Sequence, residues 1–252
     1  MDKSPLQGVL TRERFDAVLF DLDGVLTDTA KVHALCWKRM FDAFLKRRAD
    51  EQGEVSHPFD LNADYRRYVD GKPRYEGVRD FLASRGIELP QGDPSEPPGW
   101  ETVSGLGNRK NELINEILAT EGVDVYEKSV VLVRRLLGQG FRTAVVSSSK
   151  NCEAILKAAD ISNLFEVRVD GVVAVREHLA GKPAPDTFLR AARLLGAEPQ
   201  RAVVVEDAIS GVQAGRAGGF GLVIGVDRHD DAEALRAGGA DIVVADLGEF
   251  LP

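Results

Sequence analysis

A short apolar run ends abruptly in two aspartates in the segment AVLFDLDG, residues 17–24. Similar runs occupy residues 143–146 (TAVV) and 202–205 (AVVV), and each again ends in polar residues, SSS and ED. Two more apolar runs cover residues 222–224 and 242–244. Uninterrupted apolar runs of this length are typical of parallel strands that are buried on both faces. The five runs therefore predict a parallel β-sheet.

Helical periodicity separates the later runs. Helices are expected at residues 151–159, 185–196 and 210–217, and the second of them begins with a proline and ends at a glycine, which are common helix boundaries. Strands that alternate with helices predict an α/β fold with a doubly wound, Rossmann-like parallel sheet. Such sheets bind their ligands at the carboxyl ends of the strands, where the polar residues follow in this sequence.

Residues 31–124 differ from the rest, because they show helical periodicity and no convincing strand run. Two apolar helix faces are expected there, made of Leu35, Met40, Phe41, Phe44 and Leu45, and of Leu113, Ile114, Ile117 and Leu118. We therefore predict a helical cap domain, residues 33–124, inserted into a catalytic core of residues 1–32 and 125–252. Within the cap, the proline- and glycine-rich residues 90–99 are predicted to form a loop.

Composition excludes several classes of partner. The 252 residues carry a formal charge of −8, which argues against nucleic acid or an anionic membrane as the main partner. A local basic pocket can still bind a small anionic substrate. Cys36 and Cys152 lie far apart without metal-ligand spacing, and we expect both to be reduced. Residues 1–17 lack the apolar stretch of a secretory leader, and no apolar run is long enough to span a bilayer. We expect a cytoplasmic protein and a monomer.

The acidic residues at the strand ends suit a metal ion. Asp21 and Asp23 are separated by one residue, so both side chains face the same way in an extended segment. Two carboxylates this close repel each other unless a cation lies between them. Glu206 and Asp207 follow another strand run and are expected at the same edge of the sheet. Because this set contains only oxygen ligands, it predicts Mg²⁺ as the cofactor and disfavours zinc.

A lysine and a serine turn complete the set. Lys182 lies between a glycine and a proline in GKPAPD, residues 181–186, from where it can neutralise a carboxylate and a phosphoryl oxygen. Ser147, with the backbone N–H groups of the Ser148–Ser149 turn, can hold the remaining phosphoryl oxygens. Phosphoryl transfer depends mainly on positioning and charge neutralisation. The set therefore predicts a phosphoryl-transfer enzyme whose aspartate nucleophile forms an aspartyl phosphate.

The segment DLDGVLTD, residues 21–28, resembles the first motif of the haloacid dehalogenase superfamily. Ser147 resembles the second motif, Lys182 the third and Glu206–Asp207 the fourth, in the same order along nearly the whole chain.

The resemblance implies that Asp21 is the nucleophile and Asp23 the general acid and base. It also implies that Mg²⁺ is bound by the Asp21 side chain, the Asp23 carbonyl and Asp207, with help from Glu206. The catalytic residues implied are Asp21, Asp23, Ser147 and Lys182.

Within the superfamily the sequence is most similar to β-phosphoglucomutases. The resemblance implies that Arg74, in the cap loop with Gly71, grips the distal phosphate of the substrate, and that Lys110 points at the sugar. Serine and asparagine side chains of the stretch SSSKN, residues 147–151, would hold phosphate oxygens. The substrate-binding residues implied are Thr29, His33, Gly71, Arg74, Lys110, Ser148, Ser149 and Asn151.

The cap departs from the β-phosphoglucomutase pattern at several positions. Asp70 stands where those mutases commonly carry a lysine, and Lys72–Pro73 follows instead. Gly77 stands where a serine is usual, and residues 90–99 lengthen the cap. These departures concern the identity of the sugar more than the chemistry.

Two enzyme functions share the four motifs. The leading one is a β-phosphoglucomutase that interconverts β-D-glucose 1-phosphate and glucose 6-phosphate through a bisphosphate, with glucose 1,6-bisphosphate as activator. The alternative is a phosphatase that hydrolyses a small sugar phosphate or a similar monoester. A phosphoacceptor switch of the response-regulator type also pairs aspartates with a lysine, but the inserted cap and Asp23 argue against it.

Several of these residues also have a structural alternative. Ser147 could be only a helix N-cap, and Trp37 could pack rather than bind a ligand. His33 could be a helix histidine with its hydrogen bonds satisfied, while Arg74 and Lys110 could be solvated charges.

Overall fold

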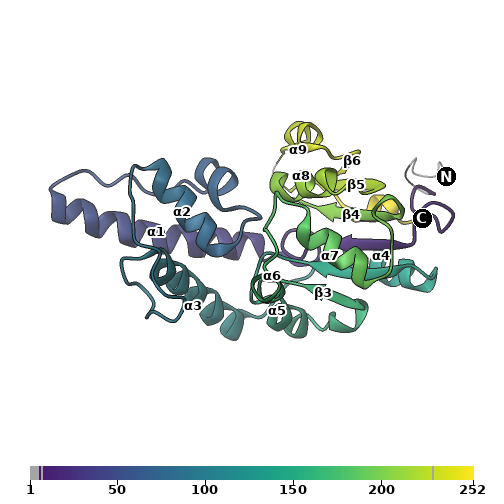
Figure 1. Ribbon diagram of the computed structural model, residues 1–252, viewed down its shortest axis with the longest axis horizontal. Coiled ribbons are helices and arrows are strands. Elements are labelled where there is room, and N and C mark those ends of the chain that lie inside the picture. The colour runs from purple at the N-terminus through teal and green to yellow at the C-terminus, as the bar shows by residue number, and fades with distance from the viewer. Residues whose placement is uncertain (1–5, 7, 229) are drawn as a thin grey trace. The chain divides into compact units, whose positions relative to one another are not determined.

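The computed structural model describes residues 6, 8–228 and 230–252. The chain divides into two compact units, which are described separately (Figure 1). One, the core unit, contains the residues up to Asp28 and from Val123 onward, and the other, the helical unit, runs from Thr29 to Gly122. The sequence-based cap boundaries, 33 and 124, lie within four residues of these limits and stay a proposal.

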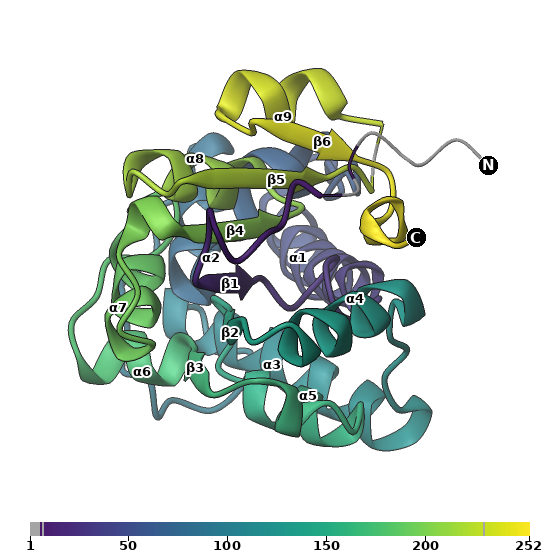
Figure 2. The same ribbon diagram turned by 90° about the vertical axis from the view of Figure 1, so that its right-hand side faces the viewer.

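The core unit contains a six-stranded sheet in which all neighbouring strands are parallel, in the order β3-β2-β1-β4-β5-β6. Figure 2 shows helices on both sides of it, with α7 and α8 on one side and α4 on the other. This confirms the predicted doubly wound α/β fold. The strands are β1 Ala17–Phe20, β2 Arg142–Val146, β3 Val167–Val169, β4 Ala202–Glu206, β5 Leu222–Val226 and β6 Ile242–Val244.

Five of the six strands match the apolar runs of the sequence, and β3 does not. It is only three residues long, and its central residue, Arg168, is exposed. An exposed arginine in so short a strand breaks the continuous apolar pattern, so the sequence analysis missed it.

The register of the sheet brings the polar strand ends together. Phe20 at the end of β1 pairs with Val145 of β2 and with Val205 of β4. The next residue, Asp21, donates its backbone N–H to Val205 O at 2.9 Å. Because the strands are parallel and adjacent, their carboxyl ends meet at one edge of the sheet.

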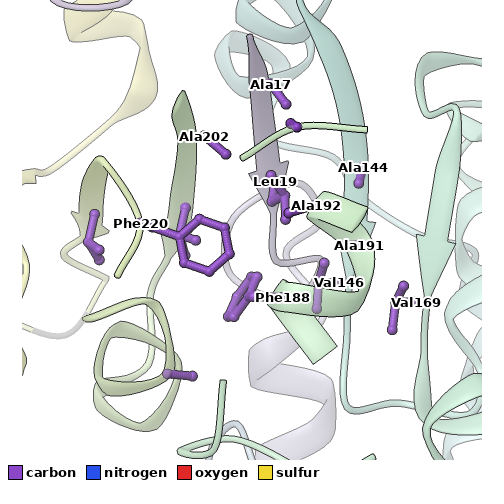
Figure 3. Close-up of a cluster of buried hydrophobic side chains, with 14 of the residues drawn as sticks. Ala17, Leu19, Ala144, Val146, Val169, Phe188, Ala191, Ala192, Ala202 and Phe220 are labelled. Atoms are coloured by element: carbon purple, nitrogen blue, oxygen red, sulfur yellow. The ribbon is translucent and has the colours of Figure 1, made fainter. Parts of the chain in front are cut away.

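Helices cover both faces of the sheet. The helices of the core unit are α4 Glu127–Gly138, α5 Cys152–Ala158, α6 Gly171–Arg176, α7 Asp186–Leu194, α8 Ile209–Ala217 and α9 Ala232–Gly238. Alternate residues of each strand point to opposite faces, and Figure 3 shows Ala17 and Leu19 of β1 on the face that α7 covers. There Phe188 of α7 is fully buried, and its ring makes an edge contact with Phe220 at a centroid distance of 6.1 Å. Burial on both faces explains the unbroken apolar runs.

The helical unit contains the α-helices α1 Ala30–Gln52, α2 Arg74–Ser84 and α3 Val103–Glu121, and the short π-helix η1 Tyr65–Val69. Its core is aromatic: the ring of Phe41 lies 4.2 Å from that of Phe81, 5.3 Å from Phe59 and 5.4 Å from Trp37, measured between centroids. The helical character predicted for this part of the chain is confirmed.

One residue of the predicted apolar faces is misplaced. Leu35 is 43% exposed, so its assignment to the buried face of α1 is wrong. The buried stripe runs instead through Cys36, Trp37, Met40 and Phe41, two adjacent pairs that are four residues apart and so lie on one side of the helix. Cys36 and Cys152 are both buried and free of disulfide bonds.

Residues 90–99 form the predicted loop, and this loop packs on the start of α3. Val103 donates its backbone N–H to Pro90 O at 3.0 Å. Asn108 donates its side-chain amide to Pro94 O at 3.0 Å and to Glu96 O at 2.9 Å. No described helix is both long and apolar enough to cross a membrane.

Truncating the core should destabilise the fold. We expect Phe188→Ala to lower the free energy of unfolding by about 3–5 kcal/mol, because it removes a fully buried ring and leaves a cavity. Leu194 lies on the same helix and is 46% exposed, so Leu194→Ala should cost less than about 1 kcal/mol. Urea denaturation followed by circular dichroism measures both, and equal losses would contradict this account of the core.

Candidate active site

The ammonium group of Lys182 lies at the centre of the polar edge of the sheet. Its Nζ is 2.5 Å from Asp21 Oδ1, 2.5 Å from Glu206 Oε1 and 3.2 Å from Val146 O. The side chains of Lys182 and Glu206 are each 1% exposed. A charge this deeply buried is tolerated only when paired, and here two carboxylates and a carbonyl surround it. The ends of β1, β2 and β4 therefore meet at one ammonium.

The carboxylates form a candidate metal site. Asp21, Glu206 and Asp207 each offer an oxygen, and these oxygens lie within 4.8 Å of one another. Glu206 Oε2 accepts hydrogen bonds from the backbone N–H groups of Asp207 and Ala208, both at 3.0 Å. Asp23 is half-buried, and its carboxylate is not part of this group. Its predicted metal contact, through the backbone carbonyl, remains a proposal.

The charge balance of this group fits a divalent cation. Lys182 contacts two carboxylates, Asp21 and Glu206, with one positive charge, and an oxygen of Asp207 lies close to theirs. Burial raises the pKa of Asp21, and Glu206 and Asp23 raise it further, while Lys182 opposes them. A cation between the carboxylates would relieve this repulsion and favour the ionised aspartate that a nucleophile requires. The all-oxygen donor set fits Mg²⁺.

Two glycines leave room for the carboxylates. Gly24 has a positive φ of 81°, and a Cβ atom there would lie 1.7 Å from Asp207 Oδ2. A Cβ atom on Gly211, in α8, would lie 1.8 Å from Glu206 Oε1. Any side chain at these positions would displace a candidate metal ligand. Gly211 was not predicted as part of the site, although a glycine inside a predicted helix often marks close packing.

The serine turn after β2 is held by its own hydroxyl groups. Ser147 Oγ accepts a hydrogen bond from Ser149 N, and Ser149 Oγ accepts one from Asn151 N, both at 3.1 Å. Asn151, not Ser147, is the N-cap residue of α5, so the N-cap alternative for Ser147 is wrong. The contacts of Ser147, Ser148, Ser149 and Asn151 with phosphate remain proposals.

In the helical unit, Lys110 is paired with His33. Lys110 Nζ lies 2.7 Å from His33 Nδ1 and 5.1 Å from the centre of the Trp37 ring. Since an ammonium can only donate, the imidazole accepts at Nδ1. Lys110 is only 5% exposed, so it is not a solvated charge, and Trp37 packs against it.

Arg74 lies at the start of α2 and contacts the same helix as Lys110. Its Nη2 donates to Asn111 Oδ1 at 2.9 Å, and burial lowers the pKa of its guanidinium from a very high starting value. Gly71, with a positive φ of 66°, precedes it in the turn from η1, and Thr29 is the N-cap residue of α1. The predicted cap residues therefore form two neighbouring groups, His33 with Lys110 and Arg74 with Asn111.

The departures in the cap have local explanations. Lys72 pairs with Asp80 at 2.6 Å, so it is engaged on the cap itself. A Cβ atom on Gly77 would lie 3.3 Å from Val69 Cγ1 and 3.4 Å from the Trp37 ring. Glycine here allows α2 to pack closely against η1 and α1.

The comparisons with known proteins identify the family of this chain. Residues 15–219 match the family model of haloacid dehalogenase-like hydrolases. The chain belongs to this family. It is 52% identical over 242 residues to a β-phosphoglucomutase of Mycobacterium tuberculosis, covering 95% of this chain and 92% of that protein. It is also 29% identical over 216 residues to a fructose-1-phosphate phosphatase of Escherichia coli, covering 84% and 96%.

Solved structures show the same fold. A β-phosphoglucomutase of Clostridium difficile superposes with a TM-score of 0.71 at 23% identity, covering 93% of this chain and 92% of that one. The resemblance of the four motifs to the haloacid dehalogenase superfamily is therefore confirmed. The prediction that this haloacid dehalogenase-like protein is an enzyme is confirmed as well.

Replacing the buried ammonium should abolish most of the activity. We expect Lys182→Ala to lower the rate of phosphoryl transfer by about 100-fold or more, as for lost electrostatic donors in other enzymes. Lys157, 69% exposed and paired with Glu153, provides the control, and Lys157→Ala should retain the wild-type rate.

Phosphate release is measured on variants whose circular dichroism shows them to be folded. Lys182→Met, which fills nearly the same space without the charge, is the second variant and replaces the alanine variant if that one does not fold. Wild-type kinetics in either folded Lys182 variant would place this lysine outside the active site.

Proposed function

We propose that this protein is a Mg²⁺-dependent β-phosphoglucomutase that interconverts β-D-glucose 1-phosphate and glucose 6-phosphate through an aspartyl phosphate and a bisphosphate. The observation that carries the proposal is the half-buried cation in the helical unit, Arg74, whose partner Asn111 is a neutral amide. Among the described residues no carboxylate forms an ion pair with Arg74. A guanidinium in this state is suited to a phosphate, which it can hold by two hydrogen bonds.

A mutase needs such a second anion site and a phosphatase does not. The bisphosphate must turn around between the two transfers, so one phosphate has to be held while the other reacts. The pair Lys110 and His33 also supports the proposal, because the hydroxyl groups of a sugar can form hydrogen bonds with both side chains. Thr29 and Gly71 are proposed to line the same substrate site, and residues 33–124 to set its specificity.

The core unit would perform the chemistry in two transfers. In the first, the C6 hydroxyl oxygen attacks the phosphorus of phosphorylated Asp21, the bond from phosphorus to the aspartate oxygen breaks, and Asp23 takes the hydroxyl proton. In the second, Asp21 attacks the phosphorus on C1 after the bisphosphate has turned, and Asp23 returns a proton to the departing C1 oxygen. Each phosphoryl group and proton is thus accounted for.

The remaining polar residues would stabilise charge. Bound Mg²⁺, held by Asp21, the Asp23 carbonyl and Asp207, would supply neutralisation of the phosphoryl oxygens. Lys182 neutralises Asp21 and would hold a phosphoryl oxygen when the nucleophile is esterified. Ser147, Ser148, Ser149 and Asn151 are proposed to hold the other oxygens. Glu206 keeps Lys182 in place.

The alternative is a phosphatase acting on a small sugar phosphate. It uses the same core residues with water as the acceptor, and the relationship to the fructose-1-phosphate phosphatase of Escherichia coli favours it. The higher identity to a β-phosphoglucomutase over almost the full length of both proteins favours the mutase.

Activity should depend on a divalent cation. We expect excess EDTA to abolish turnover and added Mg²⁺ to restore it, because Asp21 would otherwise face a phosphate as one anion facing another. Asp207→Asn should raise the Mg²⁺ concentration needed for half-maximal rate, whereas Glu233→Gln, at an exposed site on α9, should leave it unchanged. Full activity in EDTA would exclude the metal role.

The products distinguish the two functions. With β-glucose 1-phosphate, Mg²⁺ and a trace of glucose 1,6-bisphosphate, we expect glucose 6-phosphate to exceed released phosphate. Arg74→Ala should lower isomerisation more than hydrolysis, because the sugar phosphate is then poorly held, whereas water as the acceptor does not depend on this contact.

Arg79 lies on the same helix and is exposed, so Arg79→Ala is the matched control and should keep the wild-type ratio of products. Asp21→Asn provides the blank, since an amide cannot form the acyl phosphate. If the wild type releases only inorganic phosphate from every β-sugar 1-phosphate tried, the phosphatase alternative replaces the mutase.

A further inference from the structure

The two chain segments that lead to and from the helical unit run side by side within the core unit. Asp28 donates its backbone N–H to Asp124 O, and Tyr126 donates its N–H to Leu26 O, both at 2.9 Å. Thr27 and Val125 form an antiparallel bridge between these bonds. We call this pair of segments, residues 26–28 and 124–126, the junction ribbon.

Side chains close the same ribbon. The Tyr126 hydroxyl donates to Asp28 Oδ1 at 2.9 Å. Burial first of all, and then this hydrogen bond, raises the pKa of Tyr126, so the phenol stays protonated and remains a donor. The ribbon is thus held by backbone and side-chain bonds together.

Arg228 connects the ribbon to the catalytic loop, residues 21–25. It lies in the segment after β5, and its Nε donates to Gly24 O at 2.7 Å. Its Nη1 donates to Ala245 O at 3.2 Å, just beyond β6. Its guanidinium carbon lies 3.6 Å from the centre of the Tyr126 ring, which is the distance of a stacked contact. One guanidinium therefore contacts the catalytic loop, the end of the sheet and the junction ribbon.

Gly24 is a sensitive point of the catalytic loop. It follows Asp23 directly, and its backbone lies against the Asp207 carboxylate, so that even a Cβ atom has no space. The turn is tight, since Gly24 donates its N–H to Thr27 O at 2.8 Å. A shift of the Gly24 carbonyl would therefore move Asp23 or press on Asp207.

We propose that Arg228 is a positioning residue, which holds the Asp23–Gly24 turn against Asp207 and ties this turn to the junction ribbon through Tyr126. Its planar guanidinium is needed for both contacts, because it stacks on the ring with its face while its edge donates to Gly24. The inference rests on the proposed function only in taking Asp21 and Asp23 as the reacting groups. It applies equally to a mutase and to a phosphatase.

The test combines kinetics with amide hydrogen exchange. We expect Arg228→Ala to lower kcat per folded molecule by about tenfold or more, since small misplacements of catalytic groups have effects of this size. It should also raise the Mg²⁺ concentration for half-maximal rate. Exchange of the Gly24, Asp28 and Tyr126 amides should accelerate, while the amides of β4 keep their wild-type protection.

Companion variants separate the contacts. Arg228→Lys can still donate to Gly24 O but cannot stack in the same way, so it should be intermediate. Tyr126→Phe keeps the ring and loses only the bond to Asp28, so it should affect kcat less than Arg228→Ala. Arg236→Ala, at an exposed position on α9, should match the wild type in every measurement. Millimolar ethylguanidinium should restore part of the kcat of Arg228→Ala.

The outcomes distinguish this inference from the proposed function. Turnover is followed with a generic phosphate monoester, such as p-nitrophenyl phosphate, as well as with the sugar phosphate. If the wild type is inactive on both, the proposed function fails, and the amide exchange still tests the role of Arg228. Unchanged kcat per folded molecule and unchanged exchange at the three amides in Arg228→Ala would overturn the inference.

Discussion

The polar edge of the sheet depends on the contacts of the buried Lys182 ammonium with Asp21 and Glu206. An unpaired ammonium or carboxylate inside a protein costs several kcal/mol, so neither Lys182 nor its partners Asp21 and Glu206 could occupy these positions alone. Together they join the ends of β1 and β4 to the turn before α7. The sheet supplies the geometry, because parallel adjacent strands present their carboxyl ends at one edge. Fold and candidate active site are therefore stabilised by the same contacts.

The same constraint explains why the site suits phosphoryl transfer. One ammonium does not balance the two carboxylates that it contacts, and the remaining negative charge favours a divalent cation. Gly24 and Gly211 allow the backbone to approach Asp207 and Glu206 so closely that these carboxylates have little freedom to turn away. Charge that moves between the aspartate and a phosphoryl group would thus meet groups that are already in place, which is the main requirement of this chemistry.

The helical unit follows different physical rules. Its core is aromatic, and Arg74 donates to a neutral partner, the side-chain amide of Asn111. A guanidinium paired in this way keeps its charge available for an anionic ligand, whereas an ion pair would have neutralised it. Relatives of this chain include both a β-phosphoglucomutase and a phosphatase. Since the core residues serve either reaction, the difference between the two functions is expected to reside in the helical unit.

Local sequence determined five of the six strands, the helical insertion and the family, because unbroken apolar runs and polar strand ends reflect burial within a few neighbouring residues. Leu35 was assigned to the wrong helix face and β3 was not predicted, because the buried face of a helix and the position of a three-residue strand depend on the elements that pack against them. Tertiary structure alone decided which groups meet: Arg228 contacts Gly24, more than 200 residues away, and the ring of Tyr126. No local pattern predicts such a contact, since it depends on the order of strands in the sheet and on the path of the chain between them.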